Sequence, residues 1–156
     1  MGTFNMLGFN LRLSDIQAAV GVAQMAKLDR LLDERKSLAN RYHDLLANVP
    51  DIARPAVPPK CGHTYQSYVI RVLKGGRERR NAVMNHMQKA GIQTGIHYPV
   101  PLHLTDAYQA LGYPKAGSMP VTEKLAGEIL SLPMYPELGR EQIDYVVQTV
   151  REFSAL

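Results

Sequence analysis

The sequence predicts an α+β fold, in which a long N-terminal helix leads into a small sheet of two to four strands covered by helices. Three observations carry this prediction. Residues 14–48 contain no proline and repeat apolar side chains at helical spacing. In residues 65–73 apolar side chains occupy alternate positions, as in a strand, and in later segments the apolar side chains again recur at helical spacing. We expect residues 1–48 to form a lead-in and a long inter-domain helix, and residues 49–156 to form a small α/β domain.

The N-terminal lead-in turns directly into the long helix. Ser14 and Gln17 have the spacing of a capping box, in which each side chain accepts a hydrogen bond from a backbone N–H of the other residue. Asn10 and Arg12 are two residues apart, so in an extended chain both project to the same side. An amide and a guanidinium that point the same way suit an anion such as a phosphate. The alternative is a polar lead-in with Arg12 in a surface ion pair.

The long helix changes character along its length. Residues 16–23 are small and apolar almost all round, which predicts burial on several sides. Beyond Lys27 the apolar residues lie on one face of the helix only. We therefore expect the first part of the helix to pack within one domain and the second part to pack on another. The segment Asn48-Val49-Pro50 is expected to end it.

The remaining elements follow from the same signals. Residues 65–73 are the clearest strand, because Tyr68, Ile70 and Val72 form one apolar face. A second strand is expected at residues 92–97, and two prolines confine a short extended piece, residues 131–136, to a sheet edge. Helices are predicted at residues 77–90, 105–111, 121–129 and 142–153, with Gly91 as the residue that follows the first of them.

A second segment with candidate chemistry is His97-Tyr98-Pro99-Val100-Pro101-Leu102-His103. Prolines stiffen the loop, and rigid loops that carry histidine and tyrosine often present polar groups to a ligand. The segment is a poor metal site, because no acidic or cysteine ligand stands nearby in the sequence. The alternative is a capped turn in which the histidines make internal hydrogen bonds.

Composition narrows the function classes. The 156 residues suffice for one domain with a core, and Cys61, the single cysteine, excludes an internal disulfide. No apolar run reaches the roughly 20 residues of a membrane span, so we expect a cytoplasmic protein without membrane contact. The net charge of +4 is spread along the chain, apart from a tight group at Arg77, Arg79 and Arg80, so we expect no nucleic-acid partner.

Four motifs in collinear order resemble a known family. The first is Gly8-x-Asn10-x-Arg12-Leu13-Ser14-Asp15-Ile16-Gln17-Ala18-Ala19-x-Gly21. The others lie at residues 91–103, 107–113 and 131–143. Together they resemble the C-terminal part of the pyridoxal-phosphate-dependent nucleotide-sugar aminotransferases of the DegT/DnrJ/EryC1/StrS group. The resemblance implies the small C-terminal domain of a fold type I aminotransferase.

The resemblance also implies site residues and partners. In that family a large N-terminal domain carries the Schiff-base lysine, and none of the seven lysines here stands in the family's lysine motif. We therefore expect no catalytic residue in this chain and no catalysis by it alone. Asn10 and Arg12 take the family's role of reaching the cofactor phosphate of a second subunit, as in a homodimer. His97, Tyr98 and His103 take the role of substrate contacts.

The implied reaction is transfer of an amino group from an amino acid, expected to be glutamate, to a keto-sugar nucleotide. The implied cofactor is pyridoxal 5'-phosphate, and the implied partner is an N-terminal half that binds it. The alternative is a non-catalytic module for dimerisation or docking, because the apolar residues 16–26 would form an adhesive surface if nothing covered them.

Overall fold

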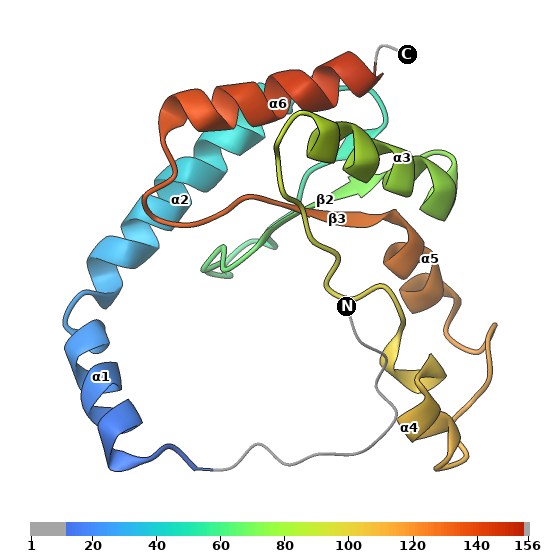
Figure 1. The fold of residues 1–156 in the computed structure, drawn as a ribbon, viewed down its shortest axis with the longest axis horizontal. Helices are drawn as coiled ribbons and strands as arrows, with labels where there is room; N and C mark the ends of the chain where they lie inside the picture. Colours follow the sequence, from blue (N-terminus) through green and yellow to red (C-terminus); the bar gives the residue numbers. More distant parts are fainter. Residues whose placement is uncertain (1–11, 155–156) are drawn as a thin grey trace.

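The computed structural model describes residues 12–154, so Asn10 lies outside the described residues. The described chain has the predicted α+β composition, with helices around a small antiparallel sheet (Figure 1). The elements are α1 (Asp15–Met25), α2 (Leu28–Leu45), β1 (Ile52–Ala53), β2 (Tyr68–Val72), α3 (Gly76–Lys89), the 3-10 helix η1 (Leu102–Leu104), α4 (Asp106–Gln109), α5 (Pro120–Glu128), β3 (Ile129–Leu132) and α6 (Arg140–Ser154).

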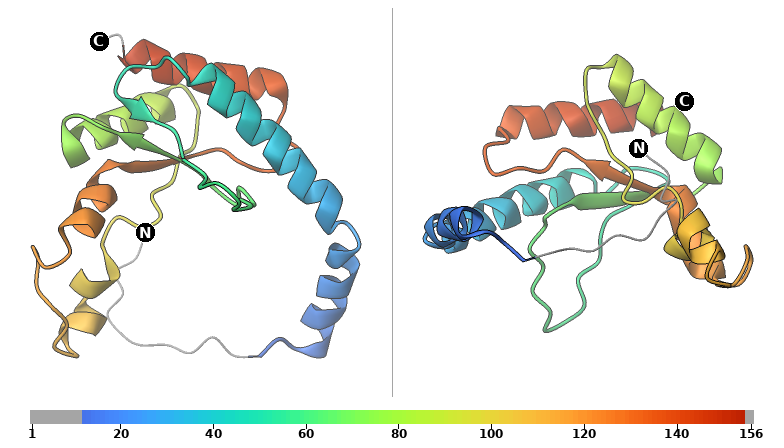
Figure 2. Two further views of the ribbon diagram at one scale, coloured as in Figure 1. Left: turned by 180° about the vertical axis from the view of Figure 1, so that it is seen from behind. Right: turned by 60° about the horizontal axis from the view of Figure 1, so that its bottom comes forward.

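The sheet has the order β1-β2-β3, and both strand pairs are antiparallel. Tyr68 pairs with Leu132 and Ile70 pairs with Leu130, so these four side chains share one face. That face is buried against α2, α3 and α6, which lie together on one side of the sheet (Figure 2). The core contains Leu38, Ala39, Tyr42, Leu46, Val49, Ile52, Tyr65, Tyr68, Ile70, Val72, Val83, Met87, Ile92, Leu130, Leu132, Leu138, Ile143, Val146, Val147 and Val150.

Two polar contacts fix α2 within this core. The Tyr42 hydroxyl donates to the carbonyl oxygen of Pro133 at 3.0 Å, which joins α2 to the end of β3. Arg41 donates from Nε and Nη2 to the two carboxylate oxygens of Asp144 on α6, at 2.9 and 2.5 Å. The second half of α2 therefore belongs to the packed body, although it precedes the boundary predicted at residue 48.

The prediction of one uninterrupted helix over residues 14–48 is wrong. The first helix ends at Met25, and the backbone N–H of Lys27 turns back to the carbonyl of Gln24 at 2.9 Å. A second helix then starts at Leu28, with Lys27 as an N-cap that has no side-chain hydrogen bond. The break lets α1 change direction relative to α2 (Figure 1).

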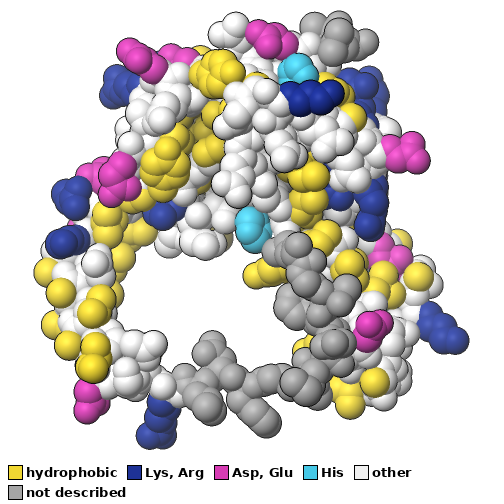
Figure 3. All heavy atoms as spheres, in the orientation of Figure 1, with side chains coloured by type: hydrophobic (Ala, Val, Ile, Leu, Met, Phe, Trp, Pro, Cys, Tyr) yellow, Lys and Arg dark blue, Asp and Glu magenta, His cyan; other side chains and the backbone are white. Residues whose placement is uncertain are grey.

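The burial predicted for the early helix does not come from the described chain itself, and its cover by a partner stays a prediction. No residue of α1 is buried, and Ile16 is 80% exposed. Figure 3 shows hydrophobic side chains gathered along α1, which projects away from the sheet on the opposite side from α4. The physical reason is that no other described element packs against α1.

The strands differ from the sequence prediction at their limits. Residues 92–97 form no strand, and only Gly95 makes an isolated bridge, to Ser131. The strand predicted to start at Tyr65 starts at Tyr68, because Tyr65 has a φ of 49° that an extended strand does not allow. Of the extended piece predicted at residues 131–136, only Ser131 and Leu132 lie in the sheet, within β3, which is its last strand.

The predicted helix termini are largely confirmed. Gly91 follows the cap of α3 with a φ of 76°, which is the left-handed conformation expected after a helix. Pro120 occupies the first turn of α5, and Ile143, Val146, Val147 and Val150 of α6 are buried. No helix within residues 12–154 is long and apolar enough to cross a membrane.

Candidate functional site

Arg12 lies exposed in the short segment 12–14 that precedes α1. The predicted capping box is present: Gln17 N donates to Ser14 Oγ at 3.4 Å, and Ser14 N donates to Gln17 Oε1 at 3.0 Å. This cap fixes where the extended backbone stops and the helix begins. The Arg12 guanidinium makes no hydrogen bond or ion pair within residues 12–154, so it is available to an anion. The matching position of Asn10 lies outside the described residues.

His97 lies on the sheet face opposite the three covering helices. Its Nδ1 is 2.9 Å from the Oγ of Ser131, and Ser131 points away from the core because Leu130 and Leu132 on either side point into it. The His97 side chain is exposed, while Ser131 is only 6% exposed. The open face of the sheet therefore holds a histidine ring that is anchored at one nitrogen.

Tyr98 extends the same exposed surface. Its ring stands edge-on to the His97 ring with centroids 5.7 Å apart, and the residue is 52% exposed. His97 and Tyr98 are therefore two exposed neighbours with rings in edge contact, and their role as substrate contacts stays a prediction.

His103 is in a different environment from His97. It is 5% exposed, and its Nε2 lies 3.1 Å from Oε1 of Glu123 at the start of α5. Glu123 also accepts hydrogen bonds from the backbone of Gly117 and Met119, at 2.9 and 3.1 Å. This geometry matches the alternative of an internally bonded histidine, and the substrate contact of His103 stays a prediction.

Glu123 gives this region an expected pH dependence. Backbone hydrogen bonds from Gly117 and then Met119 are the main causes that lower the pKa of Glu123. A carboxyl group with a lowered folded-state pKa stabilises the fold above its ordinary pKa of about 4.3, and this contribution is lost as the pH falls through the folded-state value. The stability advantage of the native chain over Glu123→Gln should therefore be present at pH 7 and shrink towards pH 3.

Urea unfolding of both proteins between pH 7 and pH 3 measures this. Glu141→Gln is the matched control, because Glu141 is exposed on α6. A stability difference between native chain and Glu123→Gln that stays constant across this range would contradict the assignment.

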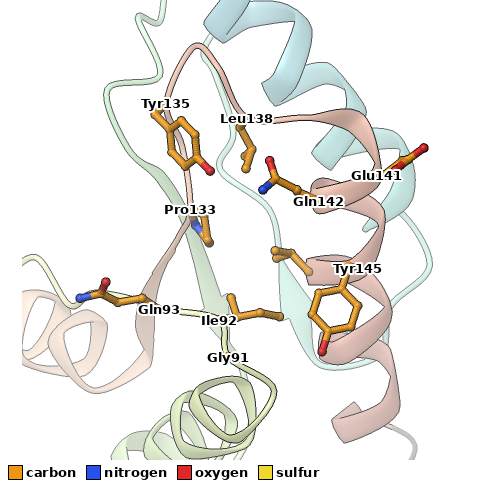
Figure 4. Close-up of a pocket in the computed structure, with 10 residues that line it drawn as sticks. Gly91, Ile92, Gln93, Pro133, Tyr135, Leu138, Glu141, Gln142 and Tyr145 are labelled. Atoms are coloured by element: carbon orange, nitrogen blue, oxygen red, sulfur yellow. The ribbon is translucent and has the colours of Figure 1, made fainter.

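The described chain also has a separate cavity of about 680 Å³ between α6, the segment after β3 and residues 91–93. Figure 4 shows Tyr135 and Gln142 leaning toward one another, while Gln93 and Glu141 point outward. The Tyr145 hydroxyl donates to Ala90 O at 3.0 Å, and Gln142 Oε1 accepts from Gly139 N at 2.8 Å. The cavity includes none of the predicted site residues.

Sequence reasoning missed three residues of this region. Ser131 stood inside a quoted motif, but only its position in β3 puts its hydroxyl under His97. Gly95 lies close to the His97 ring. Glu123 contacts His103 although the two are 20 residues apart in the sequence. The one available signal was a polar residue between two leucines, and it pointed to Ser131 alone.

Solved structures of sugar aminotransferases contain the same arrangement of a small antiparallel sheet with helices on one face. DesV of S. venezuelae, whose crystal structure is solved, has 38% sequence identity and a TM-score of 0.85, over 96% of this chain and 38% of DesV. The PLP-form of Spr1654 from Streptococcus pneumoniae has 29% identity and a TM-score of 0.83, over 92% of this chain and 36% of that one.

The chain belongs to the DegT/DnrJ/EryC1/StrS aminotransferase family, whose model matches residues 2–151. It is 42% identical over 144 residues to the erythromycin biosynthesis sensory transduction protein EryC1 of Saccharopolyspora erythraea. That match covers 92% of this chain and 38% of EryC1, so the chain spans about two fifths of the relative's length.

The described residues suit only the phosphate of the family's cofactor, pyridoxal phosphate, and not its aldehyde. Its phosphate needs charge-assisted donors, and the exposed guanidinium of Arg12 is one. Its aldehyde needs a lysine whose amine is desolvated or otherwise activated. All seven lysines are exposed: Lys27, Lys36, Lys60, Lys74, Lys89, Lys115 and Lys124. Within residues 12–154 no group of three metal-ligating side chains gathers either.

Proposed function

We propose that this chain is the C-terminal part of a pyridoxal-phosphate-dependent nucleotide-sugar aminotransferase and is not catalytic alone. The observation that carries the proposal is the family match over residues 2–151 by a chain that supplies a phosphate-suited arginine and no buried lysine. The lysine that forms the Schiff base, and the rest of the cofactor site, would come from an N-terminal half.

Asn10 and Arg12 are proposed to bind the cofactor phosphate of a second subunit. Arg12 supports this role, because its guanidinium has no partner within residues 12–154. The residue also stands just before α1, whose start is fixed by the capping box of Ser14 and Gln17. The exposed apolar residues of α1 support a covering partner, since a helix with Ile16 at 80% and Val22 at 74% exposure leaves much apolar surface in water. The N-terminal half and the second subunit of a homodimer are the proposed partners.

The proposed substrate is a keto-sugar nucleotide, which receives an amino group from an amino acid, expected to be glutamate. A 38% identical relative from Streptomyces venezuelae is a dTDP-3-amino-3,4,6-trideoxy-α-D-glucose transaminase, and its name supports this substrate class. His97 and Tyr98 are the proposed substrate contacts, because both are exposed on the sheet face that no helix covers. His103 remains a proposed substrate contact, although its Nε2 lies 3.1 Å from Glu123 and the residue is 5% exposed.

A chimera tests the proposal. The chain is fused to the N-terminal part of S. venezuelae DesV that it does not match, and pyridoxal phosphate is added to the chimera and to each part alone. The chimera is expected to gain the visible absorption band of protein-bound cofactor, and this chain alone is expected to gain none. A band on this chain alone would contradict the proposal, and so would a folded, dimeric chimera without one.

A non-catalytic interaction module is the second candidate, and the uncovered apolar surface of α1 favours it. Sedimentation of this chain, combined with the cofactor content of the chimera, separates the two candidates. A module would associate with itself and leave the chimera without cofactor. A monomeric chain together with a cofactor-loaded chimera would exclude the module.

A further inference from the structure

The His97 ring is held between two residues that no motif assigns to a role, Ser131 and Gly95. All three lie on the sheet face that the helices leave open. Ser131 is held by both polar groups of its backbone, because its N–H donates to Gly95 O at 2.7 Å and its carbonyl accepts from Gly95 N at 3.1 Å. The Ser131 Oγ is therefore presented to His97 by a rigid bridge between β3 and the 91–97 segment.

The hydroxyl of Ser131 decides which ring nitrogen carries the proton. Ser131 is 6% exposed, and within residues 12–154 the only hydrogen-bond partner of its Oγ is His97 Nδ1, at 2.9 Å. A buried hydroxyl without an acceptor costs free energy, so Ser131 donates its hydrogen to Nδ1. Because Nδ1 then acts as an acceptor, the neutral ring carries its hydrogen on Nε2.

Gly95 decides where the ring lies. A Cβ at this position would come within 2.8 Å of His97 Cε1, and the next two atoms it would meet, Nδ1 and Nε2, belong to the same ring. The ring thus occupies the space that any other residue would fill with its side chain. Its Nε2 has no hydrogen-bond partner in the described part of the chain, and the residue is exposed.

We infer that Ser131 and Gly95 are positioning residues that hold His97 as an Nε2–H donor directed at an acceptor oxygen of the substrate. This inference rests on the proposed function for the identity of the substrate. The chemistry of the ligand is set by the donor: an oxygen acceptor, such as a phosphate oxygen or a sugar hydroxyl or carbonyl, fits an N–H without a partner in the described chain on an exposed residue.

Nitrogen-15 NMR of the histidine-labelled 156-residue chain tests the positioning directly, with the His97 signals assigned by their loss in His97→Gln. In the native chain at a pH where the ring is neutral, Nδ1 should have the shift of an unprotonated nitrogen and Nε2 that of a protonated one. Ser131→Ala should move the two shifts towards each other as the tautomers mix. Ser131→Thr, which keeps a hydroxyl, should retain the native pattern, and Ser118→Ala, in an exposed loop, is the control.

Gly95→Ala provides an independent test that leaves the hydroxyl in place. The new methyl group should displace the ring and remove the tautomer preference, whereas Gly21→Ala, which meets no atom within 4 Å, should change nothing at His97. Native nitrogen shifts in both Ser131→Ala and Gly95→Ala would overturn the inference, and so would a proton on Nδ1 in the native chain. The measurement needs no substrate, so its result is independent of whether the chimera binds cofactor.

Discussion

Replacing Arg12 by alanine in the cofactor-binding chimera should weaken pyridoxal phosphate binding by about 10- to 100-fold. A hydrogen bond to a charged group contributes about 1.5–3 kcal/mol, and about 1.4 kcal/mol is a factor of ten in the dissociation constant. The described chain makes no internal use of the Arg12 side chain, so its removal should cost affinity and not folding. The dissociation constant is measured by equilibrium dialysis, with thermal unfolding as the check on the fold.

Two variants sharpen this prediction. Arg12→Lys keeps the charge and loses the planar fork, so it should fall between the native chimera and Arg12→Ala. Arg30→Ala is the matched control, because Arg30 is an exposed arginine on α2 that pairs with Glu34 at 2.6 Å. Equal cofactor affinity in Arg12→Ala and Arg30→Ala would refute the phosphate role of Arg12.

Replacing Arg80 by alanine should destabilise the fold by about 3 kcal/mol, from the cavity and from the carbonyl groups left unpaired. Arg80 is 1% exposed and donates to the carbonyl oxygen of Ile129 at 3.0 Å and to Asn81 Oδ1 at 2.8 Å. A third bond reaches Ala126 O at 3.5 Å, so the guanidinium joins α3 to the junction of α5 and β3. Burial, and to a smaller extent Arg77, lowers the pKa of Arg80.

The neighbouring Arg77 is the control for this prediction. It is exposed on the same helix, and Arg77→Ala should change the free energy of unfolding by less than about 0.5 kcal/mol. Urea unfolding measures both variants. If Arg80→Ala proved as mild as Arg77→Ala, the buried contacts of the guanidinium would have no stabilising role.

The same residue shows what composition could not predict. The sequence groups Arg77, Arg79 and Arg80 into one basic cluster, but the structure divides them. Arg80 enters the core, Arg79 lies over the Phe153 ring at 5.3 Å, and only Arg77 is exposed. A helix turns by 100° per residue, so adjacent arginines face different environments, and the cluster does not form one surface for a polyanion.

Local signals predicted the parts of the fold that depend on local energy. The capping box of Ser14 and Gln17 and the glycine after α3 follow from contacts within a few residues, and the inner face of α6 follows from the helical spacing of its apolar residues. The break between Met25 and Leu28 was not predictable in this way. Neither proline nor glycine marks it, and the segment would suit a continuous helix.

The sequence identified the candidate site residues, but it did not predict whether each is exposed or buried or which residues it contacts. His97 and His103 belong to one motif, yet one is exposed above Ser131 and the other is buried against Glu123. The partners that separate them lie 34 and 20 residues away, on β3 and α5. Sequence spacing carries no information about such contacts, because they depend on how the strands and helices pack.

The central claim is that this chain completes an aminotransferase and does not act alone, and amino transfer to a keto-sugar nucleotide tests it most directly. Glutamate, pyridoxal phosphate and a dTDP-keto-sugar are supplied to this chain, to the N-terminal part of DesV, and to the chimera of the two. We predict an amino-sugar nucleotide from the chimera and none from either part. Amino transfer by this chain alone would contradict the claim, as would a folded, cofactor-loaded chimera that forms no product.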